Sequence, residues 1–355
     1  MRKHWPKLLR FTVAMLGIAY IIHVVNWSDK PQPDGTIDPG ILTTLGRADL
    51  GLIAVALFMV LAIFPIQTVR WRLLLSARGI VVTWWQCFRL TMVGTFFNYC
   101  MPGTTGGDVV KAYYAARHSD RRADAVMSII VDRVAGLVGL VLLAALAGLL
   151  ILEDPAARRV TVGVWIGLGG FLTLAAFYLS VRLRRLTGLD RLIAILPGRG
   201  LVQKLDAAAV AFGEHKAAVV NAIALSVPVH LLLALGTALS GIALGLEAPL
   251  LLLLTVIPVA FLGAALPISY QGLGIMEGIA IPLLIHADSA NATATQVVAM
   301  LLLIRLYQII WGLSGAVFLL RGDIHLRPTD AQADHADQAQ PPPQGDGAAG
   351  SPAKL

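Results

Sequence analysis

The chain has 355 residues, of which 57% are hydrophobic and only 14% are charged, and its net charge is +7. A soluble domain carries about 25% charged and 45–50% apolar residues, so this composition excludes an ordinary soluble protein. The basic residues lie in blocks between apolar segments, as in cytoplasmic loops of membrane proteins, so the positive charge does not indicate a nucleic-acid partner. The mean hydropathy of +0.74 indicates a polytopic membrane protein.

The first two apolar segments set the predicted orientation. Leu8–Trp27 is longer than the apolar region of a signal peptide, usually about 7–15 residues, so we expect it to remain as the first transmembrane helix. Leu50–Val69 is the second span, and it ends at Arg70, the first of three closely spaced arginines. The positive-inside rule then predicts a cytoplasmic N-terminus, with residues 28–49 on the other side of the membrane.

The pattern of residues 84–118 predicts a re-entrant hairpin. Trp84–Met101 is apolar and aromatic, a Pro102-Gly103 turn follows, and residues 108–118 form a helical pattern that carries charge. Basic residues flank both ends, so the segment starts and finishes on the cytoplasmic side. Charge and non-helical backbone at membrane depth are tolerated only inside the protein or beside water, and a hairpin meets both conditions.

The remaining segments complete two similar halves. We expect an all-α polytopic membrane protein with six transmembrane helices and two re-entrant helical hairpins in an inverted repeat. Residues 1–152 form the first repeat, residues 153–325 the second, and residues 326–355 a disordered cytoplasmic tail. The further predicted segments are spans at 126–152, 161–181, 217–246 and 297–320, an amphipathic helix or a plain connector at 201–216, and the second hairpin at 250–286.

The two halves also share a local pattern. Each half contains three crossings, so the halves must be inverted relative to each other. Inverted repeats with broken helices near the midplane are typical of secondary transporters. At an offset of 165 positions, residues of the first hairpin match the second as follows: Phe96 with Phe261, Pro102 with Pro267, Thr104 with Ser269 and Gly107 with Gly272.

The first hairpin offers a candidate site for an anion. A helix that restarts after a break has unpaired backbone N–H groups and the positive end of its dipole. Gly106-Gly107 would let a head group approach closely, Thr104-Thr105 are candidate N-caps, and Asn98 precedes the turn. Lys111 lies one turn in, on the face of Asp108. The site is either a cradle for a lipid phosphate or a tight turn in which Asp108 caps its helix and pairs with Lys111.

Two charged residues follow in the next span. Asp132 and Arg133 diverge by about 100° on a helix, so each needs its own partner. In one interpretation Arg133 binds the anion while Asp132 orients Lys111 or a hairpin N–H. In the other, both side chains snorkel to the cytoplasmic interface.

The second hairpin carries its own candidate residues. Glu277 lies in the first turn after the break, where the helix dipole favours a carboxylate. It either pairs with Arg305 or takes up a proton that couples transport to a gradient. The candidate substrate-binding set is therefore Asn98, Thr104, Thr105, Gly106, Gly107, Asp108, Lys111, Asp132, Arg133, Ser269, Tyr270, Gln271, Gly272, Glu277 and Arg305.

These motifs resemble the flippase-like transmembrane family of the lysylphosphatidylglycerol synthase superfamily, an MprF-like membrane domain. The likeness covers about residues 8–322, and Lys111 matches the basic residue that the family places after Gly-Gly-Asp. Met276 departs from the family, which often has Arg there. The stretches that carry the resemblance are Phe96–Asn98, Pro102–Ala112, Asp132–Leu137, Leu266–Ser269, Gly272–Gly274 and Glu277.

The resemblance implies a bacterial inner-membrane protein, with both termini in the cytoplasm, that moves a lipid between leaflets. The implied lipid partner is an anionic or aminoacylated phospholipid, a hopanoid or an isoprenoid-linked lipid, and a separately encoded lipid synthase is a further candidate partner. Related proteins carry a soluble aminoacyl-transferase domain after the membrane part. We expect a disordered tail in its place, and therefore no synthase activity.

Two other functions remain open. One is a membrane-embedded glycosyltransferase or lipid-modifying enzyme, with Asp108 or Asp132 as its carboxylate; the other is a non-catalytic membrane subunit of a lipid synthase. The sequence shows no Walker loop, Gly-x-Ser-x-Gly elbow or His-Glu-x-x-His motif, and Cys87 and Cys100 lack metal-ligand spacing. We therefore expect a transporter rather than an enzyme, with no cofactor and no metal.

Overall fold

A computed structural model describes residues 5–31, 37–100, 106–117, 119–150, 152–153, 155–179, 187, 199–265 and 269–321. The regular secondary structure of these residues is helical apart from a short antiparallel pair, β1 (Lys30–Pro31) and β2 (Ile37–Asp38), and one bridge between Glu247 and Asn291. The helices are α1 (Trp5–Val24), α2 (Ile41–Gly46), α3 (Leu50–Ala77), α4 (Trp84–Cys100), α5 (Gly106–Arg117), α6 (Arg122–Leu149), α7 (Pro155–Leu179), α10 (Arg199–Glu214), α11 (Lys216–Ala243), α12 (Leu250–Ala265), the 3₁₀ turn η1 (Tyr270–Gly272), α13 (Ile275–Ile285) and α14 (Ala294–Leu320).

Four helices in the described part of the chain, α3, α6, α11 and α14, are long and apolar enough to cross a membrane. Each has 27 or 28 residues, and about 20 apolar residues suffice to span a bilayer core. Two further helices at predicted spans, α1 and α7, contain shorter apolar stretches at Thr12–Val24 and Thr161–Leu174. The chain is therefore an all-α, polytopic membrane protein.

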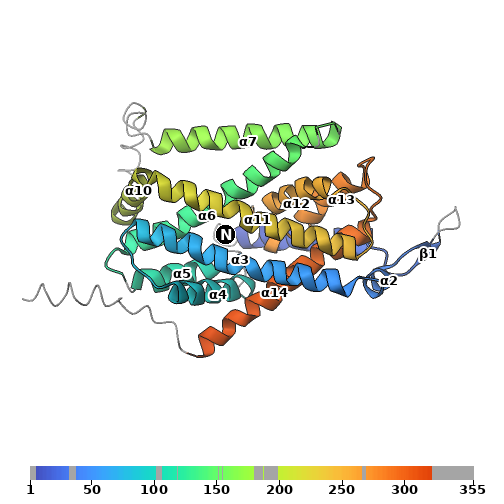
Figure 1. The fold of residues 1–355 in the computed structure, drawn as a ribbon, viewed down its shortest axis with the longest axis horizontal. Coiled ribbons are helices and arrows are strands. Elements are labelled where there is room, and N and C mark those ends of the chain that lie inside the picture. The colour runs from blue at the N-terminus through green and yellow to red at the C-terminus, as the bar shows by residue number, and fades with distance from the viewer. Residues whose placement is uncertain are drawn as a thin grey trace, which may run out of the picture.

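The two helical hairpins lie toward opposite ends of the molecule (Figure 1). The first hairpin, α4 and α5, lies at the end that also holds α10. The second hairpin, α12 and α13, lies at the end that holds α2 and β1. The helices α3 and α11 pack together along the long axis between these ends. The last helix, α14, packs on both α13 and α4, so it connects the two hairpins.

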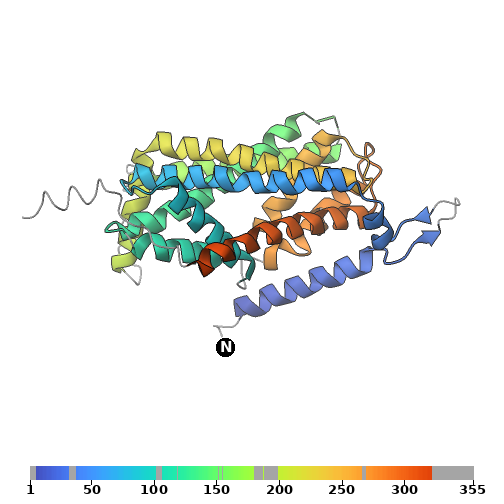
Figure 2. The same cartoon turned by 60° about the horizontal axis from the view of Figure 1, so that its bottom comes forward.

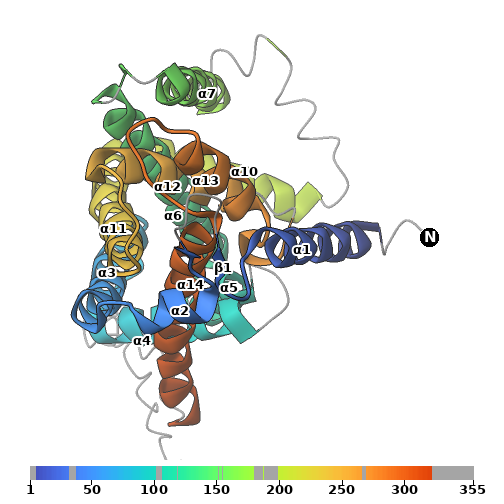
Figure 3. The same ribbon diagram turned by 90° about the vertical axis from the view of Figure 1, so that its right-hand side faces the viewer.

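Two helices lie at the margin of the bundle. In Figure 2 α1 runs along one side of the bundle, and in Figure 3 α7 lies outside the other helices. The main contacts of α1 are with η1 and α14, and α7 packs chiefly on α6. A Cβ atom added to Gly17 would lie 2.7 Å from the Cα of Gly274, so the approach of α1 to the second hairpin requires glycine at this contact.

The structure corrects one predicted boundary and confirms another element. The second predicted span does not end at Arg70, because α3 continues to Ala77 and places Arg70 inside the bundle. The segment near 201–216 is a helix, α10, whose Ala208 and Phe212 are buried against the bundle. The predicted Pro102-Gly103 turn, residues 266–268 of the second hairpin and the predicted tail at 326–355 lie outside the described residues.

Candidate functional site

The first hairpin is joined to the long helix that follows it by an ion pair. Asp108 lies in the first turn of α5 and accepts two hydrogen bonds from Arg133 on α6, from Nε at 2.6 Å and from Nη2 at 2.8 Å. A carboxylate at this position also interacts favourably with the helix dipole. The Arg133 side chain is 54% exposed and that of Asp108 17% exposed. The Arg133 side chain is therefore accessible, whereas Asp108 is largely covered.

The second hairpin carries a corresponding pair, which is one of the two alternatives expected for Glu277. Glu277 in the first turn of α13 accepts hydrogen bonds from Nη1 and Nη2 of Arg305 on α14. Glu277 also accepts from the backbone N–H of Gly274 at 2.9 Å, which caps α13. The side chains of Arg305 and Glu277 are only 9% and 0% exposed. This pair is therefore enclosed by the protein.

The two pairs occupy equivalent positions. Counted from Gly106 and Ile275, Asp108 and Glu277 are each the third residue of the helix that follows the break. Counted from Arg122 and Ala294, Arg133 and Arg305 are each the twelfth residue of the next long helix. Eleven helical steps correspond to a rise of about 16 Å, roughly half of a bilayer core of about 30 Å. Both arginines thus lie near the middle of their helices.

A close contact between backbones closes the first hairpin. A Cβ atom added to Gly107 would collide with the carbonyl group of Gly94 on α4. Asn98 on α4 accepts a hydrogen bond from the Gly107 N–H at 2.8 Å, so one of the free N–H groups at the start of α5 is satisfied from within the hairpin. Gly106 is the first residue of α5. Thr104 and Thr105 lie outside the described residues.

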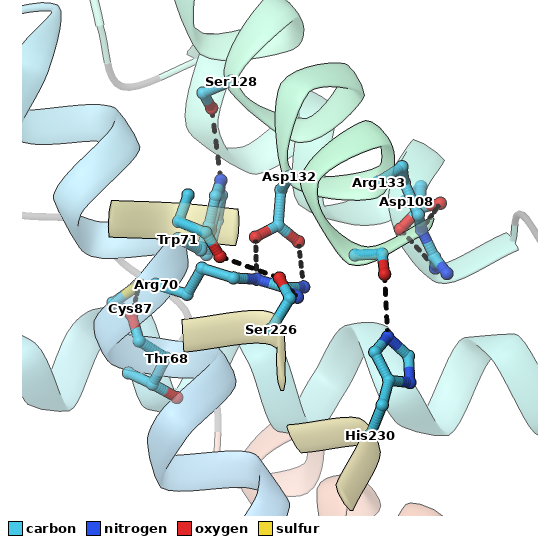
Figure 4. Close-up of polar contacts among 12 residues, drawn as sticks. Thr68, Arg70, Trp71, Cys87, Asp108, Ser128, Asp132, Arg133, Ser226 and His230 are labelled. Carbon is cyan, nitrogen blue, oxygen red and sulfur yellow. Dashed lines mark hydrogen bonds and ion pairs between the residues drawn. The ribbon is translucent and has the colours of Figure 1, made fainter. Parts of the chain in front are cut away.

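Lys111 does not pair with Asp108, so the predicted ion pair between these two residues is wrong. Its side chain turns into the bundle, where the ammonium lies 4.0 Å from the centre of the Trp71 ring in a cation–π contact. Among the described residues no carboxylate lies within 4 Å of this ammonium. The Trp71 indole N–H in turn donates to the hydroxyl of Ser128 at 3.1 Å (Figure 4). Lys111 therefore fixes α5 against α3.

Asp132 belongs to a buried cluster around Arg70 that was not predicted from the sequence. Arg70 donates from Nε and Nη2 to the two carboxylate oxygens of Asp132, at 2.8 and 3.0 Å, and from Nη1 to the hydroxyl of Ser226 at 2.7 Å. Figure 4 shows these residues on one side of α6, with Arg133 and Asp108 on the other. Asp132 thus neither orients Lys111 nor snorkels. The apolar helical pattern that continues beyond Arg70 to Leu75 was the signal for its burial.

His230 extends this cluster by one turn of α11. Because a carbonyl oxygen only accepts, Nε2 of His230 donates to the carbonyl of Gly136 on α6, at 2.9 Å. This contact is a helix–helix hydrogen bond of the kind that polar residues in transmembrane helices form. Arg70 and Asp132 come from the first half of the chain, whereas Ser226 and His230 come from the second. The Arg70 cluster, defined by these four residues, therefore ties the two halves together at depth.

The tip of the second hairpin has an unusual backbone. Gln271 has φ of +50°, and Gly272 and Gly274 have φ of +69° and +80°. Ser269 precedes this turn and is buried. The backbone of Tyr270 lies in η1, and its side chain is outside the described part. The structure therefore brings the predicted residues Gly272, Glu277 and Arg305 into contact, and Ser269 lies in the adjoining turn.

The described residues contain no group of three or more His, Cys, Asp or Glu side chains that could hold a metal ion. The charged groups are instead placed in arginine–carboxylate pairs. A guanidinium presents a planar row of N–H donors that matches the oxygens of a phosphate or a carboxylate. Arg133 lies near the middle of α6 and its side chain is accessible, so it is well placed to meet an external anion.

Comparison with known proteins identifies the family. The family described as "Lysylphosphatidylglycerol synthase TM region" matches residues 39–315, a stretch that contains both hairpins, both ion pairs and the Arg70 cluster. No curated protein matches the chain. The match covers well over half of the sequence and confirms the resemblance seen in its motifs. The chain belongs to the family of lysylphosphatidylglycerol synthase transmembrane regions.

Proposed function

We propose that the protein is a flippase that moves a phospholipid or a related polar lipid between the leaflets of the bacterial inner membrane. The family is one of membrane domains linked to lipid modification and flipping. The observation that carries the proposal is the Asp108–Arg133 pair, which is exposed although it lies halfway along a transmembrane helix. Charged groups at that depth are costly, and they are found where they meet a substrate, a partner or water.

The chemistry of this pair suits a lipid head group. The guanidinium of Arg133 gives Nε and Nη2 to Asp108, and its Nη1 makes no described hydrogen bond. An arriving phosphate would meet this free nitrogen first and could then exchange with the carboxylate of Asp108. The first turn of α5 adds the positive end of a helix dipole on the same side.

The arrangement of the hairpins supports alternating access. We infer that α4–α5 and α12–α13 are re-entrant hairpins that enter from opposite sides, as their positions toward opposite ends of the bundle suggest. The halves 1–152 and 153–325 would then form an inverted repeat with both termini in the cytoplasm. The Arg70 cluster joins the two halves and would act as the pivot when they rock against each other.

Lipid translocation in reconstituted vesicles tests this function. The purified protein is placed in vesicles that contain a fluorescent phospholipid, and a membrane-impermeant reductant reports which leaflet holds the label. We expect Arg133→Ala to slow translocation about tenfold or more, the loss expected from a charge-assisted hydrogen-bonded contact. Arg117→Ala is the matched control, because it removes an exposed arginine from the last turn of α5.

The outcomes separate the alternatives. Translocation by the wild type and by Arg117→Ala, with a defect in Arg133→Ala, supports the flippase. Wild-type vesicles that scramble no label above the protein-free background would contradict it. In that case turnover of a lipid-linked or nucleotide-linked sugar would favour the enzymatic alternative, and stable co-purification with a synthase would favour the subunit alternative.

A further inference from the structure

Three arginines that form ion pairs within the bundle, Arg70, Arg133 and Arg305, use their N–H donors in different ways. A guanidinium has one edge made by Nε and Nη2 and another made by Nη1 and Nη2. Arg70 and Arg133 both direct the Nε edge at a carboxylate. Arg305 directs the other edge at Glu277, so its Nε is left over.

The remaining donor of Arg305 lies buried without an acceptor. Its Nε makes no hydrogen bond, and the neighbouring Nη2 reaches the carbonyl of Gly272 and the sulfur of Met276 only at 3.5 and 3.4 Å. Buried donors of a charged group are normally paired, because an unpaired donor loses its hydrogen bonds to water and gains none from the protein. The free edge of Arg305 therefore faces the tip of the second hairpin with unused binding capacity.

A second unpaired group lies at the same tip. The Ser269 side chain is only 4% exposed, and its hydroxyl has no hydrogen-bond partner. Ser269 immediately precedes η1, and η1 ends at Gly272, whose carbonyl faces Arg305. The buried hydroxyl therefore lies three residues before the carbonyl that faces the buried guanidinium, within the same turn of chain.

The backbone of this turn is held in a conformation that needs support. Among the described residues, Gln271 is the one non-glycine residue with positive φ, and positive-φ glycines follow at 272 and 274. A side chain in this region costs conformational energy, and such outliers concentrate at ligand sites. The strain observed here coincides with the two unpaired groups.

We propose that the Nε edge of Arg305 and the hydroxyl of Ser269 bind a phosphate group at the tip of the second hairpin. Two guanidinium N–H groups match two phosphate oxygens, and the serine hydroxyl donates to a third or to one of these. The carboxylate of Glu277 already balances the charge of Arg305, so binding is weak enough to permit release, which a transport step requires. If the phosphate belongs to a lipid, this site is a second station on its path, which rests on the proposed function.

Equilibrium binding to the purified full-length protein tests the site. The probes are inorganic phosphate, phosphatidylglycerol and diacylglycerol, which shares the acyl chains of the phospholipid but lacks its phosphate. Affinities are compared for the wild type, Ser269→Ala and Arg305→Lys, which keeps a cation beside Glu277 but removes the Nε edge. Ser314→Ala is the control, because its hydroxyl lies on α14 and already donates to the carbonyl of Trp311.

We expect Ser269→Ala to weaken phosphatidylglycerol binding about tenfold while diacylglycerol binding and the Ser314→Ala control stay unchanged. A parallel loss for inorganic phosphate shows that the phosphate group itself is recognised, and a loss for inorganic phosphate alone assigns the site to the free anion. Equal affinities of the wild type and Ser269→Ala for both phosphates would overturn the proposal. Binding is measured apart from translocation. If the wild type translocates lipid but Ser269→Ala binds both phosphates as tightly as the wild type, only this site is refuted and not the proposed function.

Discussion

The two hairpins place an acid–arginine pair at the same positions, yet one pair is exposed and the other is enclosed. Arg133 and Asp108 of the first pair are 54% and 17% exposed, whereas Arg305 and Glu277 of the second are 9% and 0% exposed. Loss of one partner from a buried pair is strongly destabilising. An arginine whose side chain is accessible can instead turn toward water or a phosphate when its carboxylate is removed. The difference fits a structural role for the contact between Glu277 and Arg305, and it fits the lipid contact proposed for Arg133.

The largest expected effect is a loss of protein stability when the second pair is broken. Glu277→Ala leaves the charge of Arg305 buried without a carboxylate, so we expect the free energy of unfolding to fall by about 3–5 kcal/mol. Asp108→Ala leaves an arginine whose side chain is already accessible, so we expect a smaller loss of stability than for Glu277→Ala. Unfolding of the two variants in detergent micelles measures this contrast.

The double variant Glu277→Leu with Arg305→Met is the control for the first prediction. Removing both charges leaves no uncompensated ion, so much of the lost stability should return. Equal losses for Glu277→Ala and Asp108→Ala would show that exposure does not distinguish the two pairs.

A smaller effect is expected from the contact that closes the first hairpin. Gly107→Ala would drive a methyl group into the Gly94 carbonyl, so we expect a loss of about 1–3 kcal/mol or more through overpacking. Gly278→Ala is the matched control in the second hairpin, because its added Cβ meets nothing within 4 Å. This control should be neutral or stabilising by up to about 1 kcal/mol. Similar unfolding curves for the two alanine variants would contradict the close approach of α4 and α5.

The smallest effect is expected at Lys111. Lys111→Met loses a cation–π contact with Trp71 but also removes the cost of burying an ammonium, so we expect stability to change by about 1 kcal/mol or less. Translocation should persist, because this side chain faces Trp71 rather than the outside of the bundle. A folded Lys111→Met protein without translocation would place Lys111 in contact with the lipid and reassign the role given to Arg133.

The long helices and the second ion pair were predictable from the sequence. Apolar runs of sufficient length fix a membrane helix without knowledge of its neighbours. Glu277 and Arg305 are the opposite charges available near the second break, so their pairing required only that both lie at similar depth.

The partners around the first hairpin were not predictable in the same way. From the sequence, either Lys111 or Arg133 could pair with Asp108. Which of them does so depends on how α5 packs against α4 through Gly94 and Gly107. That contact turns Lys111 inward, toward Trp71. Arg70 was misinterpreted because an arginine at the end of an apolar run usually marks an interface, and the partner that buries it, Asp132, lies 62 residues away.

The most direct test of the account is translocation by a protein in which the first ion pair is exchanged, Asp108→Arg with Arg133→Asp. The exchange keeps an ion pair between α5 and α6 but moves the guanidinium off α6. We predict a folded protein whose translocation is slowed about tenfold or more, because the phosphate-binding arginine is lost from its place. Translocation at the wild-type rate would show that the pair only holds two helices together, and it would contradict a lipid-binding role for Arg133.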